Sequence, residues 1–130
     1  MEKESGKRRV LIVDDHPVLR ESIRMIIDDT PDFTVAAEAE TAADAIDACR
    51  SGAFDVILLD IRLPDQQGCD VARKIRSSGA DIKIIALSMR DEETVRRQMF
   101  NAGSDAFVSK AAGAEALIET MRSCFQNETI

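Results

Sequence analysis

Carboxylate side chains stand at two points where an apolar segment ends. Residues 10–13 lead directly into Asp14 and Asp15, and residues 56–59 lead into Asp60. An ionised carboxylate at the end of a buried segment is costly unless a cation or hydrogen-bond donors meet it. Three carboxylates within about 5 Å of one another would repel by several kcal/mol per pair at an effective dielectric constant near 20. We therefore expect either a protonated carboxyl group or a bound cation among them.

The donor atoms that these residues offer to a cation are carboxylate oxygens. No cluster of histidine or cysteine accompanies them, and an all-oxygen site favours Mg²⁺, with Mn²⁺ as the alternative, over Zn²⁺. His16 is the only histidine in the chain. It could be a ligand in principle, but it precedes Pro17, and that restrained position favours a role in helix entry.

A hydroxyl group and an ammonium group follow two later apolar segments. Ser88 comes after residues 82–87, and Lys110 comes after residues 106–108. Mg²⁺ keeps bound water and commonly completes its coordination with phosphate oxygens, so this set of side chains favours phosphoryl transfer. In that hypothesis Lys110 pairs with one phosphoryl oxygen, Ser88 donates to a second, and the metal binds the third.

Each of these residues also has an ordinary structural explanation when it is taken alone. The pair Asp14 and Asp15 is more often a helix N-cap, and Asp60 could begin a turn. Ser88 could satisfy the end of a strand, and Lys110 could be a surface charge. The phosphoryl-transfer hypothesis depends on all of them lying together.

The periodicity of the apolar residues predicts five strands, each followed by a helix. This alternation is typical of βαβ crossovers and of a parallel sheet covered by helices on both faces. In open sheets of this kind ligands bind beyond the carboxyl ends of the strands, which is where the polar residues above fall. The expected strands are residues 10–13, 33–39, 56–59, 82–87 and 106–108. The expected helices are residues 17–30, 41–52, 71–79 and 91–102 and a last helix through 117–125 that runs nearly to Ile130, with Thr41 as an N-cap.

Length and composition restrict the function further. The chain has 130 residues, 45% of them hydrophobic and 32% charged, which suits one folded domain rather than a disordered segment. Its formal net charge is −7, so we expect no phosphate-backbone footprint on this chain, and any DNA contact requires another domain. Neither GxGxxG nor a GxxxxGKS or GxxxxGKT motif occurs at a strand-to-helix turn, which argues against a nucleotide-binding protein.

The cysteines and the first residues of the chain favour a cytoplasmic protein. Cys49, Cys69 and Cys124 are odd in number, lack CxxC spacing and stand in apolar contexts typical of buried side chains, which favours a reducing compartment. No apolar segment follows the charged N-terminus, and none approaches the run of about 18 residues that spans a membrane. We therefore expect no membrane partner.

Four motifs together resemble the receiver domain of two-component response regulators. They are DD at 14–15, LLD at 58–60, ALS at 86–88 and AFVSK at 106–110, and the resemblance covers about residues 9–125. DDHPVLR and LSMRDEE are similar to the subfamily whose receivers precede a helix-turn-helix DNA-binding domain, the NarL/FixJ type. The resemblance implies a flavodoxin-like (βα)5 fold with a doubly wound parallel sheet in strand order 2-1-3-4-5. It also implies a polar tail over residues 1–8 and one receiver domain over residues 9–130.

The resemblance implies a role for each residue that matches the family pattern. Asp60 would accept a phosphoryl group from a sensor histidine kinase and thereby alter an output surface. Ser88 and Phe107 would be the switch pair, with the ring of Phe107 turned outward until phosphorylation opens space for it. Other partners would be a second copy bound through receiver surfaces, and DNA only through a separate output domain. The implied Mg²⁺ ligands are Asp15, Asp60, the backbone carbonyl of Arg62 and, through water, Asp14; the implied phosphate contacts are Ser88, Lys110 and the backbone amide of Met89.

The sequence departs from the family pattern at three places. Ala111 follows Lys110 where many receivers have proline, LPDQQG makes the loop after Asp60 more polar than usual, and Phe107 stands where many receivers have tyrosine. We also expect the long side chains of Arg62 and Arg90 to lie over the phosphate and to slow its loss.

Two other functions compete with this interpretation. A phosphatase of the haloacid-dehalogenase type also uses an aspartate nucleophile and Mg²⁺ on a parallel sheet, but it requires a second acid two residues after the nucleophile, where this chain has Arg62. A binding module with the same fold would not turn over phosphate. That alternative is disfavoured because all five functional positions of the receiver pattern are filled.

Overall fold

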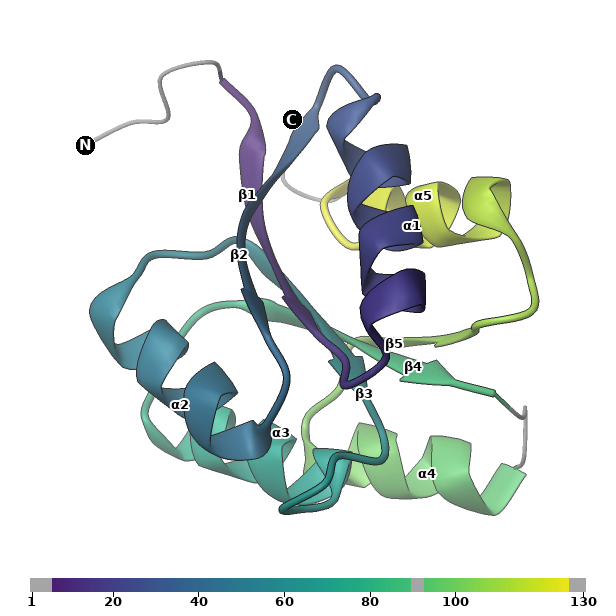
Figure 1. Cartoon of the computed structure of the whole chain (residues 1–130). Helices are drawn as coiled ribbons and strands as arrows, with labels where there is room; N and C mark the ends of the chain where they lie inside the picture. Colours follow the sequence, from purple (N-terminus) through teal and green to yellow (C-terminus); the bar gives the residue numbers. More distant parts are fainter. Residues whose placement is uncertain (1–5, 90–92, 127–130) are drawn as a thin grey trace.

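Strands and helices alternate along the chain in the computed structural model, which describes residues 6–89 and 93–126 (Figure 1). Each of the five strands is followed by one helix, as the periodicity predicted. The strands are β1 (Arg8–Val13), β2 (Phe33–Ala39), β3 (Val56–Asp60), β4 (Lys83–Ser88) and β5 (Ala106–Ser109). The helices are α1 (Pro17–Asp28), α2 (Ala42–Ser51), α3 (Gly68–Ser77), α4 (Glu93–Ala102) and α5 (Ala114–Ser123).

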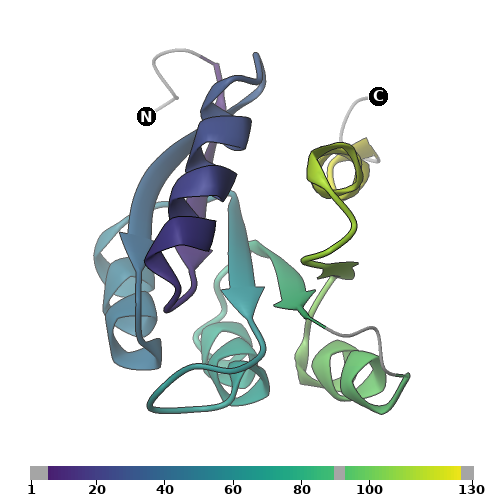
Figure 2. The ribbon, with the colours of Figure 1, turned by 45° about the vertical axis from the view of Figure 1, so that its right-hand side comes forward.

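The strands form one parallel sheet in the order β2-β1-β3-β4-β5. Helices α1 and α5 cover one face of it, and α2, α3 and α4 cover the other (Figures 1 and 2). The doubly wound, flavodoxin-like fold and its strand order are therefore confirmed. Because all strands run in the same direction, the residues that follow β1, β3, β4 and β5 meet at one edge of the sheet.

The central strands are buried on both faces, which explains why they read as continuous apolar runs. Alternate side chains such as Leu11, Ile57 and Ile84 join one core cluster with residues of α2, α3 and α4. Their neighbours, such as Ile12 and Leu58, join a second cluster with residues of α1 and α5. The ends of β1 and β3 are thus held rigidly from both sides, and these ends carry the acidic residues.

Several predicted boundaries need correction. Strand β1 begins at Arg8, because Arg8 pairs with Phe33 of β2 before the apolar run starts. Helix α5 does not run nearly to Ile130 but ends at Ser123. Its last turn tightens, since Phe125 N–H donates to the carbonyl of Arg122 at 3.0 Å, and this turn buries the Phe125 ring 6.2 Å from that of Phe33. The predicted start of the fourth helix at residue 91 lies outside the described residues.

Three further observations bear on the sequence predictions. The cysteines Cys49, Cys69 and Cys124 are free, but each is only partly buried, contrary to the expectation of buried side chains. Within residues 6–89 and 93–126, no helix has the length and apolar character that a transmembrane segment needs. Thr41 caps α2 as predicted, since its side chain accepts a hydrogen bond from Asp44 N–H at 3.1 Å.

Arg76 of α3 ties the C-terminal end of α4 to the sheet. Its Nε donates to the Gly103 carbonyl at 2.9 Å, directly after α4, and its Nη1 donates to the Ile82 carbonyl at 2.7 Å. Its Nη2 donates to Asp105 Oδ2, which also accepts the N–H of Ile84 at 2.8 Å. One guanidinium group therefore joins α3, the start of β4 and the segment between α4 and β5.

Candidate functional site

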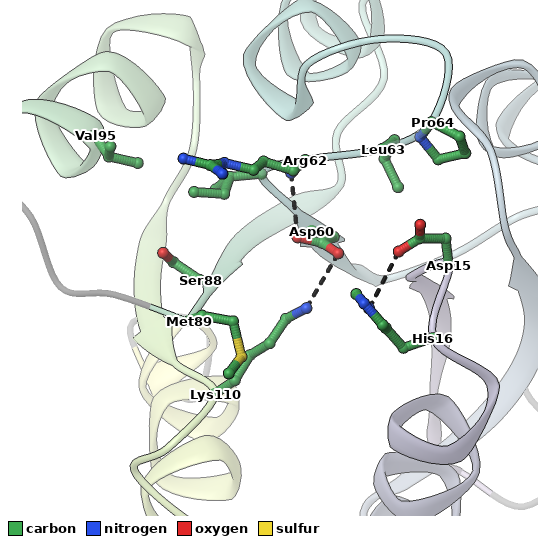
Figure 3. Close-up of a pocket in the computed structure, with 11 residues that line it drawn as sticks. Asp15, His16, Asp60, Arg62, Leu63, Pro64, Ser88, Met89, Val95 and Lys110 are labelled. Atoms are coloured by element: carbon green, nitrogen blue, oxygen red, sulfur yellow. Dashed lines mark hydrogen bonds and ion pairs between the residues drawn. The ribbon is translucent and has the colours of Figure 1, made fainter.

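A pocket of about 470 Å³ opens at the carboxyl edge of the sheet (Figure 3). Asp15 and His16 reach it from the segment after β1, and Asp60 and Arg62 reach it from β3 and the loop that follows. The remaining walls come from the ends of β4 and β5, the loop after β3 and α4: Ile61, Leu63, Pro64, Ser88, Met89, Val95 and Lys110. The structure therefore brings together the residues that the sequence predicted to meet at this edge.

A buried ammonium group lies between two buried carboxylates. Lys110 Nζ is 2.8 Å from Asp14 Oδ2 and 3.1 Å from Asp60 Oδ2. The side chain of Asp14 is fully buried, and only 5% of the Asp60 side chain and 4% of the Lys110 side chain is exposed. The cation that the acidic cluster required is thus supplied in part by the chain itself.

Burial and pairing act in opposite directions on these groups. Burial raises the pKa of Asp60 above its usual range, although the Arg62 N–H and the Lys110 charge oppose that rise and the charge of Asp14 adds to it. Burial alone would lower the pKa of Lys110, but its contacts with Asp14 and Asp60 hold that pKa above the ordinary value. Lys110 is therefore protonated at neutral pH.

The carboxylates next to this ion pair fit a divalent cation. Asp14, Asp15, His16 and Asp60 each offer one donor atom, and these four atoms lie within 4.8 Å of one another. Asp14 Oδ2 and Asp15 Oδ1 are buried, and each has one nitrogen beside it: Lys110 Nζ lies 2.8 Å from the first and His16 Nδ1 lies 3.1 Å from the second. Clustered carboxylate oxygens that keep lone pairs free are suited to a hard cation such as Mg²⁺ or Mn²⁺.

His16 takes part in the site, which the sequence analysis did not expect. It is the N-cap residue of α1, as its place before Pro17 predicted. Its ring nevertheless turns toward the acidic cluster, with Nδ1 3.1 Å from Asp14 Oδ1 and 3.1 Å from Asp15 Oδ1. The only available signal was its adjacency to the two aspartates, because the direction of the ring is set by the turn into the helix.

Hydrogen bonds within the loop after Asp60 hold it against the end of β3. Arg62 N–H donates to Asp60 Oδ1 at 3.1 Å, and Arg62 and Gln67 form an isolated bridge. Gly68 is required at the start of α3, because a Cβ there would lie 2.5 Å from the Asp60 carbonyl oxygen and 2.7 Å from Ile61 Cα. The loop can therefore lie close against the end of β3 only with glycine at this position.

Asp65, in the same loop, forms hydrogen bonds with the start of α2. The Asp65 carboxylate accepts the N–H groups of Ala42 and Ala43, at 2.8 and 3.1 Å, at the start of α2. These bonds, with the Ala42 N–H first among them, lower the pKa of Asp65. Sequence reasoning noted only that LPDQQG is polar and missed this contact, which joins residues far apart in the chain.

Arg20 fixes the segment after β1 from the other side. Its Nη1 donates to the Asp14 carbonyl at 2.6 Å, and its Nε and Nη2 donate to Glu38 at 2.8 Å and to Glu40 at 3.1 Å. Its side chain is 13% exposed. Arg20 thus connects the acidic segment to α1 and to the end of β2, a role that the sequence analysis also missed.

The remaining predicted site residues differ in how far they are buried. Ser88 is buried at the end of β4, where its carbonyl accepts the Lys110 N–H at 2.7 Å, and the Lys110–Ala111 peptide is trans. Met89 lies at the pocket and is 69% exposed, and the Arg62 side chain is exposed. Arg90 lies outside the described residues.

The expected outward position of Phe107 is wrong. Its ring is already buried, with 8% exposure, in the core cluster that includes Met99 and Ala102 of α4. The guanidinium carbon of Arg96 lies 4.7 Å from the ring centroid. The short strand β5 places the ring toward α4, and α4 provides an apolar and cationic surface that the local sequence did not reveal.

Comparison with known proteins agrees with this arrangement. The model of the response regulator receiver domain matches residues 10–122. The response regulator UvrY of Escherichia coli strain K12 is 36% identical over 119 residues, which are 92% of this chain and 55% of UvrY. The nitrate/nitrite response regulator protein NarP of the same strain is 35% identical over 115 residues, 88% of this chain and 54% of NarP. The chain thus spans about half the length of these curated relatives.

Solved structures show the same fold. The signal receiver domain of the putative response regulator NarL from Mycobacterium tuberculosis has a TM-score of 0.88 at 28% identity and covers 92% of this chain and 96% of its own. A two-component response regulator of the LuxR family from Aurantimonas sp. SI85-9A1 also has a TM-score of 0.88 at 28% identity, with 93% and 86% of the two chains covered. With the family match over most of its length and relatives of the NarL type, the chain belongs to the response regulator receiver domains.

Proposed function

We propose that this receiver domain accepts a phosphoryl group on Asp60 from the phosphohistidine of a sensor kinase. In this reaction an Asp60 oxygen forms a bond to phosphorus while the P–N bond of the phosphohistidine breaks, and the electron pair of that bond stays on the imidazole nitrogen. The observation that carries the proposal is the Lys110 ammonium group, which lies 3.1 Å from Asp60 and 2.8 Å from Asp14 inside an acidic pocket.

The residues around Asp60 have separate tasks in this proposal. The end of β3 and the Arg62 N–H hold the carboxylate still, so that its oxygen is presented to the pocket in one orientation. Lys110 offsets charge on one phosphoryl oxygen, and the Ser88 hydroxyl and the Met89 N–H donate to another. Asp14, Asp15, Asp60 and the Arg62 carbonyl would hold Mg²⁺, and the ion would offset the remaining phosphoryl charge.

Phosphorylation would then act on the surface formed by α4, β5 and α5. It replaces a group of charge about −1 by one nearer −2 and adds oxygens that attract the Ser88 hydroxyl. Because the Phe107 ring is already buried against α4, we propose that Ser88 and Phe107 shift the packing of α4 rather than move the ring from outside to inside. The output is a population shift between two packings of α4. A second copy or an attached DNA-binding domain would bind one packing better than the other.

Mass spectrometry tests the phosphoryl acceptor. With a small phosphodonor and Mg²⁺, the protein is expected to gain the mass of one phosphoryl group, and Asp60→Asn is expected to gain none. Asp55→Asn is the matched control, because Asp55 lies just before the other end of β3, where its carboxylate accepts the Arg9 N–H at 2.7 Å. Labelling that survives in Asp60→Asn, or that proceeds equally in EDTA, would contradict the proposal.

A further inference from the structure

The imidazole of His16 lies among the carboxylates of the proposed metal site. Its Nδ1 is 3.1 Å from Asp14 Oδ1 and also 3.1 Å from Asp15 Oδ1, and Figure 3 shows the ring below Asp15, with a dashed line joining the two side chains. The receiver pattern of the sequence assigns only oxygen ligands to this site. A nitrogen donor at equal distance from two of its carboxylates changes the chemistry that the site can offer.

The spacing of these atoms is that of neighbouring ligands on one metal ion. Two donors on an ion with metal–ligand bonds of 2.0–2.1 Å lie about 2.8–3.0 Å apart at a right angle and about 3.3–3.4 Å apart at the tetrahedral angle. The two distances from Nδ1, 3.1 Å each, fall between these two values and are also compatible with hydrogen bonds. Asp14, which supplies one of the oxygens, is fully buried, and its other oxygen, Oδ2, lies 2.8 Å from the Lys110 ammonium group.

The main chain of His16 is held beside the acidic cluster. The His16 N–H donates to Asp14 Oδ1 at 2.7 Å, and the residue is the N-cap of α1 with Pro17 directly after it. The side chain is still 65% exposed, so an ion from solvent can reach Nδ1. The imidazole is therefore carried by an ordered backbone and borders solvent.

We propose that His16 Nδ1 is a ligand of a first-row transition-metal ion in this pocket, with Asp14 and Asp15 as its oxygen ligands. The inference rests on the metal site of the proposed function and extends it to a second class of ion. Imidazole suits Co²⁺, Ni²⁺ and Zn²⁺, whereas Mg²⁺ takes oxygen ligands and does not gain from the nitrogen. On binding, the transition-metal ion replaces the proton on Nδ1, that proton passes to solvent, and the neutral ring keeps one hydrogen on Nε2.

The proposal predicts competition between two kinds of metal at one site. A transition-metal ion held by His16 occupies the carboxylates that Mg²⁺ needs, so the two ions exclude each other. A histidine that only donates hydrogen bonds to the carboxylates would behave differently. Its removal would change the affinities for all divalent ions by a similar factor, because it would alter only the charge of the cluster.

Calorimetric titration of protein without a histidine tag separates these two roles. We expect His16→Ala to weaken Ni²⁺ binding about tenfold or more and to leave Mg²⁺ binding within about twofold of the parent. Asp15→Asn is the companion variant and is expected to weaken both ions, because Asp15 is a ligand of both. Equal Ni²⁺ affinity in the parent and His16→Ala would overturn the inference, as would an equal loss for Ni²⁺ and Mg²⁺.

The single histidine makes a spectroscopic test unambiguous. Imidazole proton resonances that shift strongly with Co²⁺ can arise only from His16, since the chain has no other histidine. We expect such shifts in the parent, reversed by excess Mg²⁺. A Co²⁺ complex with thiolate absorption and unshifted imidazole resonances would assign the ion to the cysteines and overturn the inference. If Ni²⁺ binding depends on His16 but Mg²⁺ does not bind the parent, the inference stands and the Mg²⁺ part of the proposed function fails.

Discussion

The side chains of Asp60 and Lys110 are charged and buried, a combination that costs free energy of folding. A carboxylate and an ammonium group are both withdrawn from water, and each is tolerated because the other is near. The residual cost falls on Asp60, whose pKa is raised chiefly by burial. The pocket is therefore destabilised as long as Asp60 is ionised and no metal is bound.

This cost predicts the stability of Asp60→Asn in EDTA. A carboxyl group whose pKa is higher in the folded than in the unfolded chain stabilises the fold at low pH, and that contribution is lost as the pH rises through the folded pKa. We therefore expect Asp60→Asn to be more stable than the parent at neutral pH and this gain to shrink as the pH falls toward about 4. Mg²⁺ should stabilise the parent more than the variant.

Urea unfolding as a function of pH measures the effect. Asp47→Asn is the control, because Asp47 is 74% exposed and its pairing with Arg50 across one turn of α2 contributes little. A variant at position 60 that is no more stable than the parent at neutral pH would show that Lys110 fully compensates the buried carboxylate.

The identity of the site residues could be predicted from sequence, but their side-chain directions could not. Asp14, Asp60, Ser88 and Lys110 each follow an apolar strand, and parallel strands bring such residues to one edge. The ring of Phe107 was placed wrongly because its position depends on α4, a different part of the chain. The Asp65 and Arg20 contacts were missed for the same reason, since both cross between elements.

At the scale of elements, α1 positions the acidic segment through Arg20. The guanidinium group holds the Asp14 carbonyl and is itself held by Glu38 and Glu40 at the end of β2. Arg24, one turn later, also pairs with Glu38, at 3.3 Å, but none of its contacts reaches the acidic segment. The two arginines differ in the one contact that concerns the metal site.

This difference predicts unequal effects of Arg20→Met and Arg24→Met. We expect Arg20→Met to weaken Mg²⁺ binding about tenfold, because groups that orient ligands commonly contribute that much to metal affinity. Arg24→Met should leave Mg²⁺ binding unchanged, and Arg20→Lys should recover part of the loss because an ammonium group can still reach one acceptor. Calorimetry with Mg²⁺ gives the comparison, and equal affinities for the parent and Arg20→Met would exclude a positioning role.

The order and type of the elements could be predicted from the sequence, but several of their ends could not. Periodicity gave each strand and helix because it reflects burial on one or two faces. The last helix was extended too far because Phe125 continues the apolar spacing of α5. In the folded chain that ring leaves the helical course to pack beside Phe33, a contact that the spacing alone does not contain.

At the scale of the whole molecule, the proposed signal has to travel from Ser88 to the α4–β5–α5 surface. Lys110 and the metal would carry most of the charge stabilisation, so Ser88→Ala should still accept phosphate at Asp60. A hydrogen bond to a charged group contributes about 1.5–3 kcal/mol, enough to shift a balanced equilibrium by roughly tenfold or more. We therefore expect Ser88→Ala to be phosphorylated but to transmit little of the change.

Amide chemical shifts provide the measurement, since the chain contains neither tryptophan nor tyrosine for fluorescence. Shifts over residues 93–125 are compared with and without a phosphoryl mimic, in the parent and in Ser88→Ala. The parent should show large changes over α4 and β5, and the variant only small ones. Changes of equal size in both proteins would mean that the signal bypasses Ser88.

The hydrogen bond from Arg76 to the Gly103 carbonyl holds the C-terminal end of α4, so a tilt of this helix would move mainly its N-terminal end. The end at Ala102 is the pivot, and the opposite end, near Val95, borders the pocket. Since a helix of ten residues is about 15 Å long, a tilt of about 10° would carry its far end roughly 2.6 Å while the pivot stayed in place. An event at the pocket would therefore displace the end of α4 that borders the pocket the most, and the Phe100 ring, close to the pivot, would travel much less.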